Sequence, residues 1–216
     1  MLITQLVPAA VRAVEWFGDR PDATVFPGED GHLRRGDSAR RREFATTRAC
    51  AREALAGLGV RPGPIPVGAD RSPGWPAGVV GSLTHCACYR AAAVANSRAV
   101  RSVGIDAEPA HPLPRRVLER VTTQAERAAL PADIHPLDRV LFSAKETLFK
   151  AWYPITRRYL GFLDATVEIR PPHRFLARIL VDDCPTSLRG LLTGRYIVER
   201  GLVITALTVP HEGERS

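Results

Sequence analysis

The feature that most constrains this chain is an amphipathic helix predicted for residues 142–154. Glu146 and Lys150 stand four residues apart and therefore share one helix face, with Lys145 beside it. We expect Asp138 to cap the start of the helix and Pro154 to end it. The apolar residues recur at helical spacing and predict a second, buried face made of Leu141, Phe142, Leu148, Phe149 and Trp152.

The charged face of this helix has two interpretations. Taken alone, Glu146 and Lys150 would form a surface ion pair that contributes about 0.2–0.5 kcal/mol. A second motif, VGIDAEP at residues 103–109, favours a functional site, because it is typical of the end of a strand. Residues two apart in a strand point the same way, so Asp106 and Glu108 aim at one point.

Two carboxylates placed in this way repel each other unless a cation lies between them. Oxygen ligands suit a hard ion such as Mg²⁺ or Mn²⁺. We therefore predict a metal site made of Asp106 and Glu108, with Glu146 as the third acidic group.

Length and composition bound the class of protein. The 216 residues are enough for one large domain or two small ones of about 100 residues each. No run of 18 or more apolar residues occurs, so we expect no membrane span. The start of the chain lacks the basic and apolar regions of a signal peptide, which predicts a cytoplasmic location. Four cysteines are too few for a disulfide scaffold at this size.

The net charge of +7 arises almost entirely from arginine, since Lys145 and Lys150 are the only lysines. Both lie in the predicted helix, and an ammonium is a compact point charge for a phosphate. A basic surface favours polyanions or an acidic protein partner and does not choose between them.

Upstream, residues 40–55 predict a second amphipathic helix that ends before Gly57. Its arginines, Arg41, Arg48 and Arg52, fall close together, either as a solvated basic face or as an anion site. The proline-rich loop 61–76 carries Arg71, which could reach a ligand, and the segment after it carries Thr84 and His85, which could donate to a phosphate.

The strand pattern predicts three hairpins. They pair residues 91–95 with 100–106, 165–169 with 175–181, and 196–198 with 202–209. Thr122 or Thr123 begins a short helix with Glu126 in its first turn. Each half of the chain therefore offers a helix followed by a strand hairpin. We predict an α+β fold of two pseudo-symmetric subdomains, residues 1–103 and 104–216, with the site in the cleft between them.

These motifs together resemble the 4′-phosphopantetheinyl transferase superfamily, in the surfactin/enterobactin type found in actinobacteria. The resemblance covers about residues 40–209 and includes the arginine-rich helix at 42–55. Its motifs, in order, are WPAGVVGSLTHC at 75–86, VGIDAEP at 103–109 and FSAKETLFKAWYP at 142–154. The sequence departs from the family pattern at three positions, where Ala107 replaces a polar residue, Ser72 separates Arg71 from the following proline, and Phe142 replaces tryptophan.

The resemblance implies Mg²⁺- or Mn²⁺-dependent transfer of phosphopantetheine from coenzyme A to a serine of an acidic acyl or peptidyl carrier protein. The leaving group would be adenosine 3′,5′-bisphosphate. Glu146, Lys150 and Asp106 would be catalytic, with Glu146 taking the serine proton directly or through water. The implied contacts to coenzyme A are Arg40, Arg48, Arg52, Arg71, Thr84, His85, Asp106, Lys145 and Lys150.

Other functions remain open on the residues alone. Paired carboxylates with basic helices also suit a metal-dependent nuclease, or a non-catalytic nucleic-acid binder. The aromatic content of 6% and the clustering of basic residues near Thr84 and His85 weigh against both. An inactive relative acting as a scaffold is a third alternative. We expect a monomer that binds neither nucleic acid nor membrane.

Overall fold

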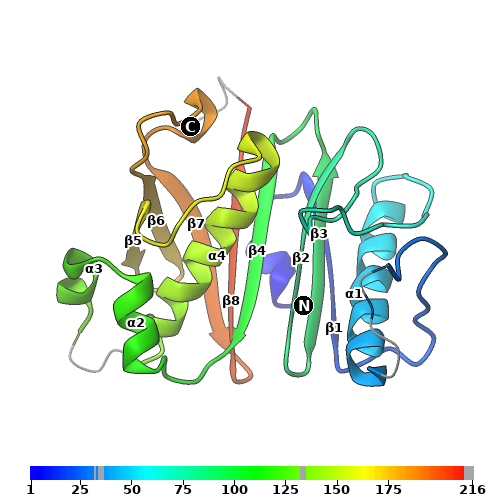
Figure 1. Cartoon of the computed structure of the whole chain (residues 1–216), viewed down its shortest axis with the longest axis horizontal. Coiled ribbons are helices and arrows are strands. Elements are labelled where there is room, and N and C mark those ends of the chain that lie inside the picture. The colour runs from blue at the N-terminus through cyan, green and yellow to red at the C-terminus, as the bar shows by residue number, and fades with distance from the viewer. Residues whose placement is uncertain (32, 34–36, 132–134, 212–216) are drawn as a thin grey trace.

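The computed structural model describes residues 1–31, 33, 37–131 and 135–211, and two antiparallel sheets form its centre (Figure 1). The first sheet has the order β1 (Val11–Phe17), β3 (Tyr89–Asn96), β2 (Val79–Cys86). The second has the order β4 (Ser102–Pro109), β8 (Leu202–Val209), β7 (Leu192–Glu199), β6 (Arg174–Ile179), β5 (Ala165–Arg170). The α+β class predicted from the sequence is confirmed.

Two long helices, α1 (Ser38–Ala56) and α4 (Leu137–Thr156), each cover one sheet (Figure 1). The short elements are η1 (Ile3–Gln5), α2 (Arg115–Val121), α3 (Gln124–Ala129) and η2 (Thr186–Leu188). No helix in the described part of the chain combines the length and the hydropathy that crossing a membrane requires.

Alternation along β3 explains how the first sheet is buried on both faces. Ala92 and Val94 point toward α1 and join its buried residues Ala51 and Leu55. Tyr89, Ala91, Ala93 and Ala95 point the other way, into a core shared with the second sheet. The small side chains of β3 allow α1 to approach on one face and the core shared with the second sheet on the other. Strand β3 therefore lies between two packed layers.

Strand β4 shows the same alternation, and it decides where the acidic residues lie. Val103, Ile105 and Ala107 pack into the shared core between the sheets. The residues between them therefore face the opposite side, which is the side that α4 covers. Asp106 is thus held under the helix, on the strand next to the first sheet.

The two sheets meet at β2 and β4. Here the strands are joined by hydrogen bonds from the backbone of β4 to side-chain hydroxyls of β2, in place of backbone–backbone hydrogen bonds. Ser82 Oγ accepts the Ile105 N–H at 3.1 Å, and Thr84 Oγ1 accepts the Ala107 N–H at 2.9 Å. Residue numbers rise together on both strands, so β2 and β4 run in the same direction at this seam. The hydroxyls satisfy the outward N–H groups of β4, which would otherwise be buried without partners.

Several predicted elements are confirmed. Residues 38–56 form the arginine-rich helix, with Gly57 as its C-cap. Strands β5 with β6 and β7 with β8 form the two predicted C-terminal hairpins. Thr123 and Glu126 form a complete capping box at the start of α3.

Three predictions are wrong. Residues 91–95 and 100–106 do not form a hairpin, because β3 pairs with β1 and β2 while β4 pairs with β8. Asp138 does not cap α4, since it lies inside the first turn and accepts hydrogen bonds from the N–H groups of Leu113 and Arg139. Pro154 does not end the helix, which continues to Thr156.

Gly104 sets the distance between α4 and β4, and it offers a direct test of this packing. A Cβ atom at this position would lie 2.1 Å from the Thr147 carbonyl oxygen and 2.9 Å from the Ala151 nitrogen. Both contacts are helix backbone that cannot rotate away. We predict that Gly104→Ala lowers the free energy of unfolding by about 3 kcal/mol or more in urea denaturation.

Gly63→Ala is the matched control, because a Cβ there meets nothing within 4 Å. It should change the free energy of unfolding by less than about 0.5 kcal/mol. Equal unfolding midpoints for the two variants would contradict the packing described above.

Candidate active site

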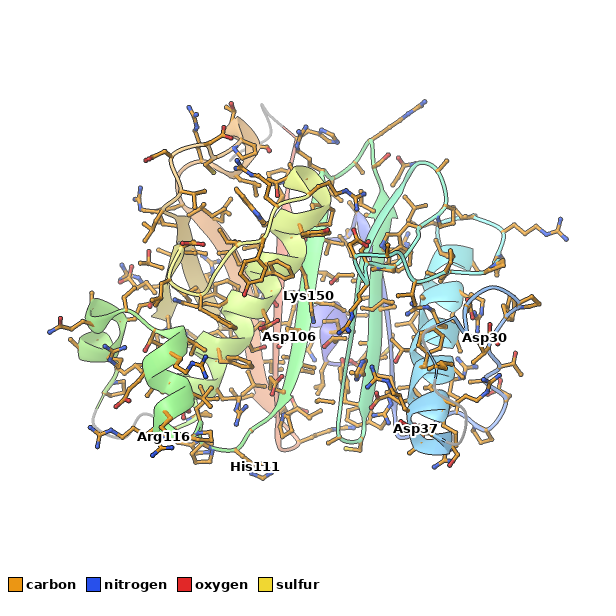
Figure 2. All side chains as sticks on the ribbon, viewed as in Figure 1. Asp30, Asp37, Asp106, His111, Arg116 and Lys150 are labelled. Carbon is orange, nitrogen blue, oxygen red and sulfur yellow. The ribbon has the colours of Figure 1, made fainter. Side chains whose placement is uncertain are left out.

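Asp106 is the centre of the site, and its carboxylate is almost fully buried. Its Oδ1 accepts hydrogen bonds from the Lys150 ammonium at 2.7 Å and from the Thr84 hydroxyl at 3.4 Å. Its Oδ2 accepts a hydrogen bond from the Ser143 hydroxyl at 2.9 Å. Figure 2 shows Asp106 and Lys150 near each other in the middle of the molecule. Strands β2 and β4 and helix α4 thus converge on one carboxylate.

A polar stripe on α4 supplies the helix side of the site. Ser143, Glu146, Thr147 and Lys150 follow the spacing i, i+3, i+4 and i+7, so they share the face that lies over β4. Lys150 also donates to the Ile105 carbonyl at 3.1 Å. The face of α4 that contacts β4 is therefore polar, and it can hydrogen-bond to Asp106 and to the strand backbone.

The three predicted acidic residues are electrostatically coupled. Burial raises the pKa of Glu108 to about 7, with a further contribution from the negative charge of Asp106. The guanidinium of Arg139, 3.2 Å from Glu108 Oε2, opposes this rise. Burial and Asp106 likewise raise the pKa of Glu146, against the opposing charge of Lys150. Glu108 and Glu146 therefore lie in places where negative charge is disfavoured.

The donor chemistry of this group suits a hard divalent cation, although the side chains are not closed around one point. No three His, Cys, Asp or Glu side chains among the described residues are close enough to hold a metal ion together. Lys150 and Arg139 instead neutralise Asp106 and Glu108. The carboxylate oxygens and their mutual repulsion are nevertheless what an Mg²⁺ site requires. Ala107 has its side chain in the core between the sheets, so it offers no side-chain ligand.

The Thr84–His85 motif lies at the end of β2. Its two residues differ, because Thr84 is buried against β4 and His85 is partly exposed beside α1. Thr84 is buried and bonded to β4, so it holds the site together. The His85 side chain is 48% exposed, and its Nδ1 lies 3.0 Å from Glu43 on α1. Partial burial lowers the pKa of His85, with Glu43 opposing the shift and the cations Lys150, Arg90 and Arg40 adding to it. His85 therefore lies within electrostatic reach of both Lys150 and Arg40.

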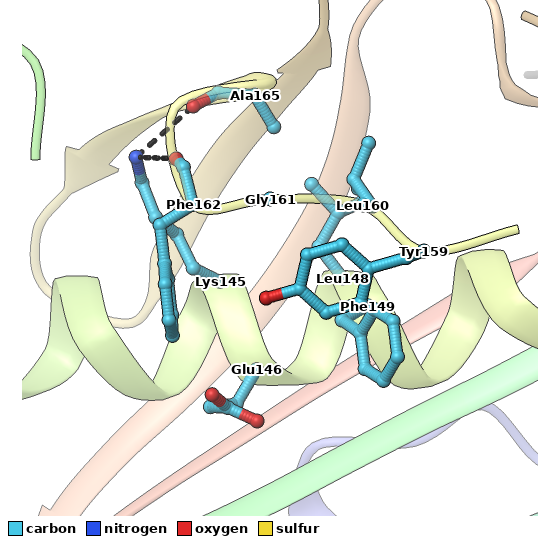
Figure 3. Close-up of a pocket in the computed structure, with 9 residues that line it drawn as sticks. All are labelled: Lys145, Glu146, Leu148, Phe149, Tyr159, Leu160, Gly161, Phe162 and Ala165. Atoms are coloured by element: carbon cyan, nitrogen blue, oxygen red, sulfur yellow. Dashed lines mark hydrogen bonds between the residues drawn. The ribbon is translucent and has the colours of Figure 1, made fainter. Parts of the chain in front are cut away.

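Lys145 lies apart from the carboxylate cluster. Its side chain is only 2% exposed, and its ammonium bonds to Glu126 at 2.9 Å. It also donates to the carbonyls of Phe162 at 2.6 Å and Ala165 at 3.0 Å. Figure 3 shows Lys145 and Glu146 leaving the helix in different directions. Lys145 therefore anchors α3 and the loop before β5.

Two of the predicted arginines are also engaged in structure. Arg52 pairs with the fully buried Glu29 at 2.9 Å, and Arg48 donates to the Ile65 carbonyl at 3.0 Å. Both guanidinium groups hold surrounding loops onto α1 rather than forming a solvated basic face. Arg71 lies in an exposed turn with a positive φ of 65°, and no side-chain partner of Arg71 is found among the described residues.

Sequence reasoning missed four residues that touch the site. Arg139 and Ser143 bond to Glu108 and Asp106, Thr205 of β8 bonds to Ser143, and Glu43 bonds to His85. Ser143 could have been found from its helical spacing to Glu146 and Lys150. The others are brought in by tertiary contacts that no spacing in the sequence indicates.

An apolar pocket opens beside Glu146, between α4 and the loop that follows it (Figure 3). Its lining is mostly aromatic and aliphatic, with Lys145 and Glu146 as the charged members. The lining residues are Lys145, Glu146, Leu148, Phe149, Tyr159, Leu160, Gly161, Phe162 and Ala165. A carboxylate at the edge of such a pocket can meet a partly apolar ligand.

The comparisons with known proteins agree with the geometry. Residues 29–95 match the 4′-phosphopantetheinyl transferase N-terminal domain, and residues 102–205 match the 4′-phosphopantetheinyl transferase superfamily. The boundary between the matches falls between β3 and β4, where the two sheets divide.

Relatives match over nearly the whole chain. The chain is 47% identical to 4′-phosphopantetheinyl transferase PptT of Mycobacterium tuberculosis, over 96% of this chain and 98% of the relative. It is 45% identical to 4′-phosphopantetheinyl transferase Svp of Streptomyces mobaraensis, over 96% and 89%. It is 42% identical to 4′-phosphopantetheinyl transferase Npt of Nocardia iowensis, over 95% and 99%.

The chain belongs to the 4′-phosphopantetheinyl transferase superfamily and is an enzyme of that class. The resemblance stated from the three motifs, including its actinobacterial form, is confirmed.

The placement of Lys145 gives a prediction about stability. Removing its charge would leave Glu126 buried without its cation, since both side chains are less than 5% exposed. We predict that Lys145→Met lowers the free energy of unfolding by about 3–5 kcal/mol, measured by denaturant titration.

Arg115→Met is the control, because the Arg115–Glu119 pair lies at the surface, and it should cost less than about 1 kcal/mol. If Lys145→Met unfolds like the wild type but raises the KM for coenzyme A, Lys145 contacts the substrate and its structural assignment fails.

Proposed function

We propose that this chain transfers the 4′-phosphopantetheine group from coenzyme A to a serine of an acyl or peptidyl carrier protein. The products are the holo carrier protein and adenosine 3′,5′-bisphosphate. The observation that supports the proposal is that Asp106 contacts Lys150 and is electrostatically coupled to Glu108 and Glu146 where the two sheets meet, in a chain of this family. Residues 1–103 would supply the nucleotide-binding half, and residues 104–216 the acidic half.

Asp106, Glu108 and Glu146 would hold the divalent cation, Mg²⁺ or Mn²⁺. When bound, the cation neutralises charge on the pyrophosphate of coenzyme A. Lys150 lies against Asp106 and is more exposed than it, so its ammonium is available to a phosphate oxygen. Together these charges would offset the negative charge that develops on the leaving adenosine 3′,5′-bisphosphate as the P–O bond of the pyrophosphate breaks.

Glu146 would take the proton from the carrier serine, directly or through water. Its carboxylate has no hydrogen-bond partner among the described residues, and it lies at the edge of the apolar pocket. The serine oxygen attacks phosphorus and its proton passes to the base, so no covalent enzyme intermediate is needed. The pocket next to Glu146 is suited to the uncharged pantetheine arm, which places the reacting phosphate beside the carboxylates.

The outer phosphates of coenzyme A would meet the cations of the first sheet and α1. His85 and Arg40 remain accessible for this role, whereas Arg48, Arg52 and Lys145 are engaged elsewhere. A net charge of +7 suits an acidic carrier protein, and we place the enzyme in the cytoplasm as a monomer without nucleic-acid or membrane partners.

Mass spectrometry of an apo carrier protein tests the activity itself. Incubation with this chain, coenzyme A and Mg²⁺ should add about 340 Da to the carrier, the mass of a phosphopantetheine group placed by phosphoryl transfer. We predict that Asp106→Asn and Glu146→Gln each lower the rate at least about 100-fold, as does an excess of chelator.

Glu168→Gln is the matched control, because Glu168 lies on the surface of β5 and pairs with Arg170 at the same hairpin. It should transfer at the wild-type rate. Retention of more than roughly a tenth of the wild-type rate by either site variant, or full turnover in chelator, would contradict the metal role.

His85 gives a prediction about affinity and pH. Its lowered pKa leaves the ring neutral near pH 7, with its single N–H on Nδ1, 3.0 Å from the Glu43 carboxylate. Donation to a phosphate from Nε2 therefore requires proton uptake. Coenzyme A should therefore bind more tightly as the pH falls. We predict that His85→Ala weakens coenzyme A binding about tenfold near pH 6 and reduces its pH dependence, measured by titration calorimetry.

His173→Ala, at the turn between β5 and β6, is the control and should leave the pH profile intact. Identical pH profiles for His85→Ala and the wild type would remove His85 from the phosphate site.

A further inference from the structure

A row of buried hydroxyl groups leads to Asp106 between α4 and β8. Thr147 Oγ1 lies 2.6 Å from Thr205 Oγ1, Thr205 Oγ1 lies 2.9 Å from Ser143 Oγ, and Ser143 Oγ lies 2.9 Å from Asp106 Oδ2. All three hydroxyl residues have no solvent-exposed surface. Nothing in the reaction proposed above uses them.

The direction of these hydrogen bonds follows from the carboxylate at the end. An ionised carboxylate only accepts, so Ser143 must donate its proton to Asp106. Thr205 can then donate to Ser143, whose hydroxyl and carbonyl oxygens are both within 3.0 Å. Thr147 can in turn donate to the hydroxyl or the carbonyl of Thr205. The row therefore ends with a hydroxyl that donates to Asp106.

Burial of three hydroxyls adds little to stability compared with apolar residues of the same size. A buried hydroxyl must keep its hydrogen bond to offset the loss of water, whereas valine at position 205 would fill a similar volume without any partner. What the hydroxyls add is a fixed orientation of the Asp106 carboxylate. Oδ1 of Asp106 is held by Lys150 and Thr84, and the hydroxyl row fixes Oδ2 on the opposite side.

We propose that Ser143 and Thr205 are positioning residues that fix the orientation of the Asp106 carboxylate, Ser143 by donating to Oδ2 and Thr205 by holding the Ser143 hydroxyl in line. This inference rests on the proposed function, in which Asp106 is a ligand of the divalent cation. Partners behind a metal ligand orient it, and their removal typically lowers metal affinity or activity about 10–100-fold.

The test compares three variants with the wild type by Mn²⁺ titration followed by electron paramagnetic resonance, and by transfer kinetics. Ser143→Ala should weaken Mn²⁺ binding about tenfold, and Thr205→Val about threefold to tenfold, with the KM for coenzyme A unchanged. Thr205→Ser keeps the hydroxyl and should behave like the wild type. Unfolding midpoints identify any variant that fails to fold. The Mn²⁺ affinities of the two variants that remain folded then decide whether the positioning role holds.

Two outcomes would overturn the inference. One is Mn²⁺ affinity within about twofold of the wild type for both Ser143→Ala and Thr205→Val. The other is an equal loss in Thr205→Ser, which keeps the hydroxyl, and Thr205→Val, which removes it, because the effect would then come from altered packing at this position and not from the hydroxyl.

A crystal structure of Ser143→Ala separates this inference from the proposed metal role. If the wild type binds no Mn²⁺, the proposed cation site fails, but the orientation of Asp106 can still be observed. We expect its carboxylate to occupy more than one orientation once the donor is gone. A single orientation that superposes on the wild type would overturn the positioning role.

Discussion

The structure depends on a seam in which two sheets are joined by side-chain hydroxyls. The N–H groups of Ile105 and Ala107 point away from β8, and Ser82 and Thr84 of β2 accept them. An unpaired strand edge is otherwise a place where chains aggregate, so this contact protects β4 as well as joining the halves. Because Thr84 also bonds to Asp106, the same seam that joins the sheets orients the central carboxylate.

Close packing of α4 on β4 follows from this seam and concentrates charge beneath the helix. Gly104 lets the helix backbone approach, and the polar stripe of α4 then meets Asp106 at hydrogen-bond distance. Carboxylates gathered in a partly buried place disfavour their own charge, as the raised pKa of Glu108 indicates. Lys150 and Arg139 offset that cost within the protein. A divalent cation with the phosphates of coenzyme A would do the same during the proposed reaction.

The sequence predicts the parts of this site that depend on local periodicity. Strand alternation predicts Asp106 and Glu108, and helical spacing predicts Glu146 and Lys150. The sequence does not reveal that Lys145 bonds to Glu126 and to a loop that only the tertiary fold brings near. The bonds of Arg48 and Arg52 are hidden for the same reason, since Glu29 and the Ile65 carbonyl lie far from them in sequence. The hairpin assigned to 91–106 failed because adjacent strands joined different sheets, and a turn signal cannot reveal the choice of partner.

In the proposed mechanism, three carboxylates from β4 and α4 gather around one divalent ion where the two sheets meet. A crystal structure of the chain grown with coenzyme A and Mg²⁺ would test this arrangement. We expect a single ion held by Asp106, Glu108 and Glu146, with Lys150 against the phosphates. An ion bound elsewhere, with these three side chains directed apart, would contradict it.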